Sequence, residues 1–191
     1  MVKGVVFDLD GTLLDSQLCF SSIRKILGVP ENHLILEYLD TLSSEEKNKK
    51  AKMLEDIELR AAIKSKLFPG VQEIFEKLSK NGIRIGILTR NCAQVMGWFL
   101  KAYPELSIDH AITRENTAPK PSPQGLHVFL ERWKLTPNEL LMVGDSYLDM
   151  ECGINAGAQT VWFKQSSSQI SVEVDYIIEH LNDLGKILDS V

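Results

Sequence analysis

The strongest constraint on this chain is a short apolar run that leads directly into two acidic residues and a glycine. The run Val5–Phe7 is followed by Asp8-Leu9-Asp10-Gly11. The apolar residues fit a buried strand, but carboxylates placed side by side at its end are unfavourable unless a cation, a proton or hydrogen bonds compensate. The run therefore predicts a strand that delivers a carboxylate pair to a catalytic metal site.

Further apolar runs rich in β-branched residues predict the other strands of a buried parallel sheet. Helical patterns separate these runs, for example before Asn81-Gly82, an expected helix C-terminus, and after Ser122-Pro123, an expected N-cap and first helical residue. The alternation predicts an α/β fold, a Rossmann-like parallel sheet with helices on both faces. The expected strands are Gly4–Phe7, Ile83–Leu88, Leu140–Val143 and Thr160–Phe163, with weaker candidates at Ala111–Thr113 and Tyr176–Ile178.

One long segment interrupts this alternation. Residues 15–68 contain no convincing strand and look helical throughout, with Ser43-Ser44-Glu45-Glu46 opening a long charged helix and Pro69-Gly70 following it. With 191 residues, the chain has room for one domain that carries a smaller insertion. We therefore expect a catalytic core formed by residues 1–14 and 69–191, and a small all-helical cap at 15–68 over the strand ends.

Polar residues follow three of the predicted strands. Asp8, Thr89 and Asp145 each come at or just after a strand's carboxyl end, and these ends meet at one edge of a parallel sheet, where open α/β folds bind ligands. Asp149 lies about one helical turn beyond Asp145. Together with Asp10, these carboxylates form an oxygen-rich site suited to Mg²⁺.

Lys120 is the expected cation beside this site. It lies in Ala118-Pro119-Lys120-Pro121-Ser122-Pro123, where the prolines restrict the backbone from which the lysine extends. Its charge, added to that of a metal, would let a carboxylate cluster accept a phosphate group.

In this order and spacing, the motifs resemble those of the haloacid dehalogenase superfamily, and most closely its phosphoglycolate phosphatase-like branch. The four matching motifs are Asp8-Leu9-Asp10-Gly11-Thr12, Thr89 at a strand end, Lys120 before Pro-Ser-Pro, and Gly144-Asp145 through Asp149. The expected cap is short for that branch, and Thr89 is followed by Arg90-Asn91 rather than directly by asparagine.

The resemblance implies a phosphatase that works through an aspartyl-phosphate. Asp8 would be the nucleophile, and Asp10 would protonate the leaving alcohol and then deprotonate the hydrolytic water. Thr89 and Lys120 would hold the phosphoryl oxygens, with Asn91 as a further phosphate-binding candidate. Mg²⁺ would be held by Asp8, Asp145 and the backbone carbonyl of Asp10, with Asp149 acting through a water or as an orienting group.

Each of these residues also has an ordinary structural reading. Thr89 and Asp145 could be helix N-caps, Asp149 an exposed helical acid and Lys120 a solvated lysine. Arg90 and Arg114 could contact substrate, or order loops at the surface. Cys92 is most simply a small buried hydrophobe.

The presence of Asp10 favours phosphate-ester hydrolysis over dehalogenation within the superfamily, and a small phosphorylated metabolite is the expected substrate. A phosphosugar mutase of the same fold is the nearest alternative reaction. A protein that kept the fold but only binds a partner is the alternative from another class.

Composition limits the expected partners and compartment. The net charge is −5 and no basic stripe is present, so nucleic acid is not an expected partner. The three cysteines form no CxxC pair, which argues against a disulfide framework or zinc site. No apolar run approaches a membrane span or a signal-peptide core, so we expect a cytoplasmic protein. Ser166-Ser167-Ser168 is expected to be a polar loop, and nothing in the sequence indicates an oligomeric state.

Overall fold

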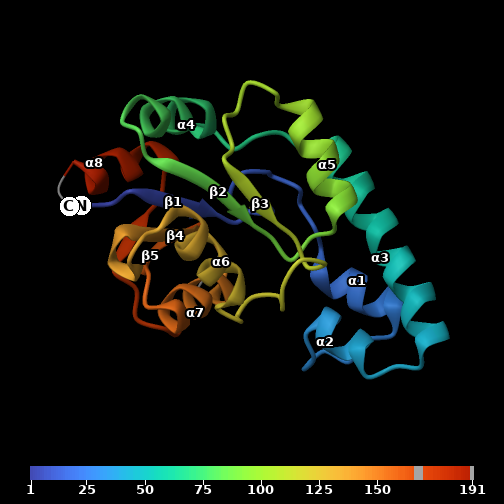
Figure 1. The fold of residues 1–191 in the computed structure, drawn as a ribbon. Coiled ribbons are helices and arrows are strands. Elements are labelled where there is room, and N and C mark those ends of the chain that lie inside the picture. Colours follow the sequence, from blue (N-terminus) through green and yellow to red (C-terminus); the bar gives the residue numbers. More distant parts are fainter. Residues whose placement is uncertain (166–169, 190–191) are drawn as a thin grey trace.

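A computed structural model describes residues 1–165 and 170–189, so the predicted loop Ser166-Ser167-Ser168 lies outside the described residues. Within them, six parallel strands form one sheet in the order β3-β2-β1-β4-β5-β6 (Figure 1). The predicted α/β parallel sheet is therefore confirmed. The strands are β1 (Gly4–Phe7), β2 (Arg84–Leu88), β3 (His110–Ile112), β4 (Leu140–Gly144), β5 (Gln159–Phe163) and β6 (Tyr176–Ile178).

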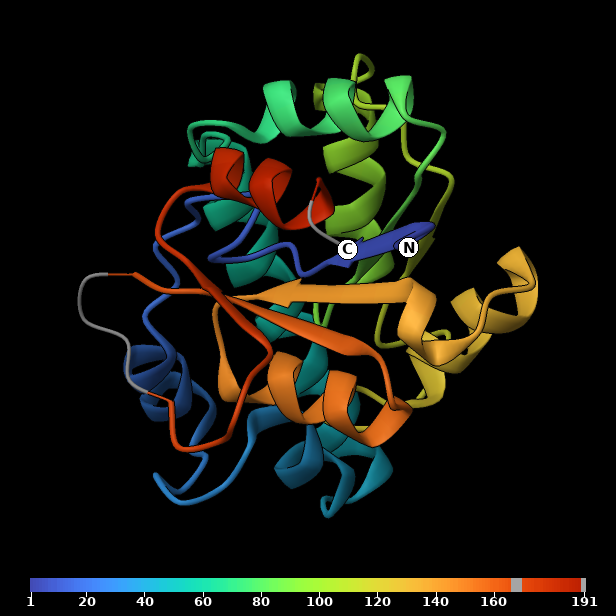
Figure 2. The ribbon, with the colours of Figure 1, turned by 90° about the vertical axis from the view of Figure 1, so that its left-hand side faces the viewer.

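Helices cover both faces of the sheet. Side chains of α4, α5 and α8 share one apolar cluster with β1, β2, β4, β5 and β6, whereas α6 and α7 pack in a second cluster on the other face. Figure 2 shows α4 and α8 on one side of the sheet and α7 on the other. These helices are α4 (Val71–Lys80), α5 (Ala93–Ala102), α6 (Gln124–Trp133), α7 (Tyr147–Ala156) and α8 (Leu184–Leu188), and the short 3₁₀ helices are η1 (Pro137–Glu139) and η2 (Leu181–Asp183).

The central strands are buried because both faces of the sheet are covered. Every residue of β1 and β4 is buried, which explains why these strands are continuous apolar runs rather than alternating patterns. The carboxyl ends of β1 and β4 are in register, with Phe7 paired to Val143. Whatever follows these two strands is therefore placed side by side. None of the helices in the described part of the chain is long and apolar enough to span a membrane.

Residues 15–68, here called the cap segment, contain three helices that lie beside the sheet (Figure 1). They have a small apolar cluster of their own, formed by Ile23, Leu27, Val29, Ile35, Leu39 and Leu54. Two backbone hydrogen bonds join the stretch that leads into the segment to the stretch that leads out of it. Asp15 N donates to Lys66 O and Phe68 N donates to Leu13 O, both at 2.9 Å. The helices are α1 (Phe20–Leu27), α2 (Ile35–Asp40) and α3 (Ser44–Lys64).

Several helix ends agree with the sequence. Ser43 caps α3, its hydroxyl accepting from Glu46 N at 3.3 Å. Asn81 is the C-cap of α4 and Gly82 follows with φ +68°.

Several predicted boundaries were wrong by one residue, including the end of β4 at Gly144 and the start of β5 at Gln159. Ile83 is not in β2, because its N–H donates to Leu78 O at 3.0 Å and so closes the end of α4. Ser122 is not the N-cap of α6, because its N–H donates to Pro119 O at 3.1 Å in a turn, and Pro123 takes the N-cap position. β3 also begins and ends one residue earlier than expected, since its register is set by pairing with β2 at His110 to Ile112.

Candidate active site

The centre of the site is a buried lysine between two carboxylates. Lys120 Nζ lies 2.5 Å from Asp8 Oδ1 and 2.5 Å from Asp149 Oδ1, and only 2% of the lysine side chain is exposed. Burial alone would lower the pKa of Lys120, but the carboxylates of Asp149 and Asp8 outweigh it and raise the pKa. The lysine is therefore a fixed positive charge beside Asp8.

Asp8 is held in place by the sheet. Its N–H donates to Val143 O at 2.9 Å, so the pairing of β1 with β4 extends to the first carboxylate. Burial, the largest effect, raises the pKa of Asp8 well above its usual range despite the charge of Lys120. A cation at this position would restore the ionised form that a nucleophile requires.

Three carboxylates gather at the ends of β1 and β4. One oxygen each from Asp8, Asp145 and Asp149 lies within 4.8 Å of the others. Burial raises the pKa of Asp145 to about 7, and Thr12 Oγ1 donates to Asp145 Oδ1 at 3.2 Å. Hard oxygen donors such as these suit Mg²⁺, which is usually bound through one or two of the available carboxylates.

Glycine is required beside this cluster. Gly11 has φ +84°, and a Cβ there would lie 2.3 Å from Asp145 Oδ2. The turn after the first carboxylate pair can therefore approach Asp145 only because residue 11 has no side chain.

Asp149 already uses both of its carboxylate oxygens. Oδ1 accepts from Lys120, while Oδ2 accepts from Ser146 N at 3.0 Å and Ser146 Oγ at 2.5 Å. The bond from Ser146 N is one half of a capping box at the start of α7. These bonds fit the expected orienting role of Asp149, because they fix Lys120 and the loop that carries Asp145.

Asp10 belongs to a second hydrogen-bonded group. Asn91 Nδ2 donates to Asp10 Oδ2 at 2.7 Å, and Asp10 Oδ1 is buried with no hydrogen-bond partner among the described residues. Burial raises the pKa of Asp10. A carboxyl group that retains its proton more readily, with one oxygen free, is suited to exchange a proton with a bound ligand.

Thr89 and Asn91 are linked through the turn after β2. Thr89 Oγ1 accepts from Asn91 N at 3.0 Å, which leaves the Thr89 hydroxyl proton able to donate to a ligand. Asn91 Oδ1 accepts from Cys92 N at 2.9 Å. Asn91 thus connects the end of β2 to Asp10, a contact that its predicted role in phosphate binding did not include.

Two arginines of the sheet-bearing part pair with glutamates of the cap segment. Arg114 Nη1 donates to both oxygens of Glu58, at 2.7 and 2.8 Å, and Arg90 donates to both oxygens of Glu37, at 2.9 and 2.7 Å. Arg90 also donates to the backbone carbonyl of Lys120. Both arginines therefore order neighbouring segments, one of the two readings that the sequence left open.

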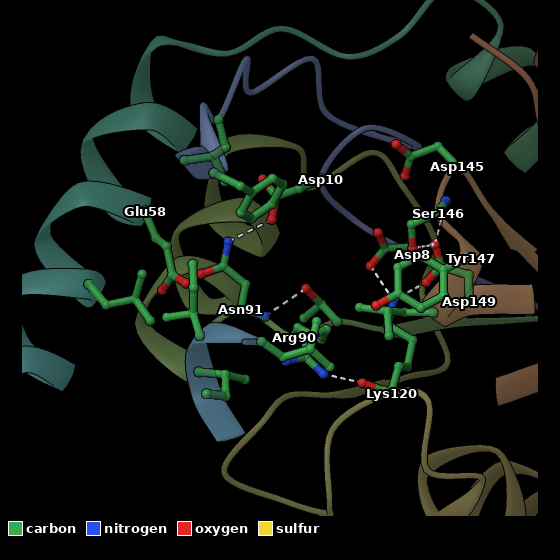
Figure 3. A pocket seen from close by; sticks show the side chains of 18 of the residues that line it. Asp8, Asp10, Glu58, Arg90, Asn91, Lys120, Asp145, Ser146, Tyr147 and Asp149 are labelled. Carbon is green, nitrogen blue, oxygen red and sulfur yellow. Dashed lines mark hydrogen bonds and ion pairs between the residues drawn. The ribbon is translucent and has the colours of Figure 1, made fainter. Parts of the chain in front are cut away.

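Glu58 is a charged site residue that sequence reasoning missed. It projects from α3 into the site near Asn91 (Figure 3), and burial raises its pKa to about 7. A signal was present, because Leu54, Glu58 and Ala62 are the buried residues of α3 and are spaced by four. An acid on the apolar stripe of a helix indicates a paired or functional group.

Most of these groups line one pocket of about 300 Å³ between the sheet edge and the cap segment. Among the residues that line it are the seven site residues predicted from the sequence, Asp8, Asp10, Thr89, Asn91, Lys120, Asp145 and Asp149, and Arg90 lines it too. The fold and site thus define an α/β protein with a carboxylate-rich pocket at the carboxyl edge of a parallel sheet.

Comparison with known proteins identifies the class more closely. Residues 17–163 match the family model of haloacid dehalogenase-like hydrolases. An uncharacterized hydrolase of Saccharomyces cerevisiae is 34% identical over 100% of this chain and 92% of its own length. The chain therefore belongs to the haloacid dehalogenase-like hydrolases, as its motifs predicted.

Two solved structures show how closely the fold agrees. A haloacid dehalogenase phosphatase of Thermococcus onnurineus is 26% identical, with a TM-score of 0.73 and 98% of each chain covered. A predicted phosphoglycolate phosphatase of Haemophilus somnus has a TM-score of 0.75 at 22% identity, also over 98% of each chain. The second likeness shows the fold alone.

Proposed function

We propose that this hydrolase is a magnesium-dependent phosphatase that cleaves the phosphate monoester of a small metabolite through an aspartyl-phosphate. The observation that carries the proposal is the buried Lys120, which lies 2.5 Å from Asp8 inside the carboxylate pocket. A phosphoryl group beside Asp8 would meet a fixed positive charge there. The Thermococcus relative, named as a phosphatase, supports the same reaction.

In the first step, the Asp8 carboxylate attacks phosphorus and the bond from phosphorus to the alcohol oxygen breaks. Asp10 gives its proton to that oxygen, which its raised pKa favours. Thr89 and Lys120 donate hydrogen bonds to the phosphoryl oxygens as their charge redistributes.

In the second step, a water molecule attacks the phosphorus of the aspartyl-phosphate. Asp10, now ionised, takes a proton from this water, inorganic phosphate leaves and Asp8 is restored. Asn91 holds Asp10 at the required place in both steps through its 2.7 Å hydrogen bond.

The metal would be held by Asp8 and Asp145 with the backbone carbonyl of Asp10, while Asp149 keeps Lys120 in position. Bound Mg²⁺ would neutralise the carboxylates and the incoming phosphate, which otherwise repel each other.

The test is release of inorganic phosphate from 4-nitrophenyl phosphate and from a panel of phosphorylated metabolites, with Mg²⁺ and with EDTA. We expect activity only with Mg²⁺, and a loss of at least about 10³-fold in Asp8→Asn. Asp56→Asn, on the exposed side of α3, should keep wild-type activity. Equal activity with EDTA and in Asp8→Asn would exclude this mechanism.

The same panel separates the alternative functions. A phosphosugar mutase would isomerise a sugar phosphate with little free phosphate and would need a bisphosphate primer. A binding protein would turn over no ester in the panel and would bind a protein partner tightly.

A further inference from the structure

The pocket has two chemically different sides. Towards the sheet it is lined by the acidic side chains, Lys120 and Thr89 described above. Towards the cap segment it is lined mainly by apolar side chains, namely Leu18, Phe20, Leu34, Ile35, Leu36 and Leu54. If the phosphoryl group lies at Asp8, the alcohol part of the substrate lies against this apolar side.

Of the charged groups on the cap side, Glu58 is already paired with an arginine and Arg24 is bonded through its Nε. Both oxygens of Glu58 accept from Arg114, at 2.7 and 2.8 Å. Arg24 Nε donates to the backbone carbonyl of His33 at 3.2 Å. A leaving group with several hydroxyls would find few partners here, and a buried hydroxyl without a partner is costly.

Two half-exposed aromatic side chains line the pocket, one from the cap segment and one from the sheet-bearing part of the chain. Phe20 at the start of α1 is 54% exposed and Tyr147 at the start of α7 is 45% exposed, and both line the pocket. Large exposed aromatic side chains that line a pocket are suited to contact an apolar ligand. The volume of about 300 Å³ is at the small end of ligand pockets, which fits one ring-sized group beside a phosphoryl group.

From these contacts we propose that the substrates are phosphate monoesters whose alcohol part is apolar, and preferably aromatic, rather than a polyhydroxylated sugar. This inference rests on the proposed phosphatase function. The cap segment selects the substrate by burying that apolar part, while the sheet edge carries out the phosphoryl transfer.

The first test compares 3-phenylpropyl phosphate with sn-glycerol 3-phosphate under saturating Mg²⁺. Both are esters of primary alcohols, so the reaction is matched, while the leaving groups differ in polarity and in size. We expect kcat/KM to be at least about tenfold higher for the phenylpropyl ester, mainly through a lower KM. Equal values, or a preference for the glycerol ester, would overturn the inference.

The second test uses an exposed residue, so that folding is not at risk. Phe20→Ser should lower the preference for the phenylpropyl ester about 2- to 10-fold. Ile26→Ser is the matched control, because Ile26 lies on the same helix, is 56% exposed and does not line the pocket. The ratio of the two kcat/KM values is independent of the amount of active enzyme. An unchanged ratio in Phe20→Ser, or the same change in Ile26→Ser, would count against the proposal.

The two proposals fail in different ways. If neither these esters nor 4-nitrophenyl phosphate release phosphate with Mg²⁺, the proposed function is wrong and the inference falls with it. If phosphate is released from polar and apolar esters alike, the phosphatase stands and only the apolar specificity is refuted.

Discussion

Glu58 shows how a single residue acquires its properties from its surroundings. On α3 it is an acid on an otherwise apolar stripe, and the fold buries it against Arg114. Burial raises its pKa to about 7, and the arginine only partly offsets this effect. The charge state of Glu58 should therefore change near neutral pH, far above the usual range of a glutamate.

The stability of the protein should carry this pH dependence. The pKa of Glu58 is raised in the folded state, so its contribution to stability is fully present below about pH 4.5 and is lost as the pH rises to about 7. Glu58→Gln mimics the neutral form of Glu58. Because glutamine does not titrate, its contribution to stability does not change with pH. The free energy of unfolding of wild type minus that of Glu58→Gln should fall by up to roughly 3 kcal/mol over this range.

Urea denaturation at a series of pH values measures this difference. A constant difference between the two proteins from pH 4.5 to 8 would mean that Glu58 titrates at its ordinary pKa. Loss of the ion pair with Arg114 in the variant adds a constant to the difference in free energy of unfolding. The change of that difference with pH decides the result.

At the scale of elements, the turn after β2 connects three parts of the molecule. Thr89 accepts a hydrogen bond from Asn91, and Asn91 donates one to Asp10. Arg90 donates to Glu37 on α2 and to the backbone carbonyl of Lys120. One short loop thus orders the expected acid–base residue, the lysine-bearing loop and a helix of the cap segment. Because Glu37 is 42% exposed, we expect the ion pair itself to contribute modestly.

Replacing Arg90 tests the structural part of this role. Arg90→Met keeps the apolar stem but removes the bonds to Glu37 and to the Lys120 carbonyl. We expect the free energy of unfolding to fall by about 1–2 kcal/mol, and hydrogen exchange to quicken in α2 but not in α6. Arg60→Met, at an exposed position of α3, should change stability by less than about 0.5 kcal/mol. Unchanged protection of α2 would show that Arg90 does not hold this helix.

At the scale of the whole molecule, the parallel sheet brings distant residues to one edge. Asp8, Thr89 and Asp145 follow β1, β2 and β4, which are neighbours in the sheet though far apart in the sequence. The cap segment then covers this edge and contributes the apolar side of the pocket. Because the buried carboxylates repel one another, a cation that binds among them should stabilise the folded chain as a whole.

Mg²⁺ should therefore raise the midpoint of thermal unfolding. We expect the midpoint to rise by roughly 2–4 °C for each 1 kcal/mol by which Mg²⁺ binding stabilises the folded state. Most of this rise should be lost in Asp145→Asn. Asp56→Asn should respond like wild type. Calorimetry with Mg²⁺ and with EDTA measures the effect without any substrate, and an equal rise in Asp145→Asn would remove Asp145 from the metal site.

Much of the fold was predictable because its determinants are local. Runs of buried apolar residues marked the strands to within a residue, since both faces of the sheet are covered. Polar residues at strand ends could be placed together from their order in the chain, because parallel strands end at a common edge. The small errors at Ile83 and Ser122 arose where turn hydrogen bonds, which no periodicity records, decided the boundary.

Local patterns in the chain were enough to establish the sheet, the carboxylate motifs and the lysine between prolines, because each depends on neighbouring residues. The packing of the folded chain was needed to establish that Asn91 holds Asp10, that Glu58 and Glu37 pair with Arg114 and Arg90, and that the cap side of the pocket is apolar. These contacts depend on how α2 and α3 pack against the sheet edge. That packing results from many weak contacts between residues far apart in the sequence, so no local pattern in the chain predicts it.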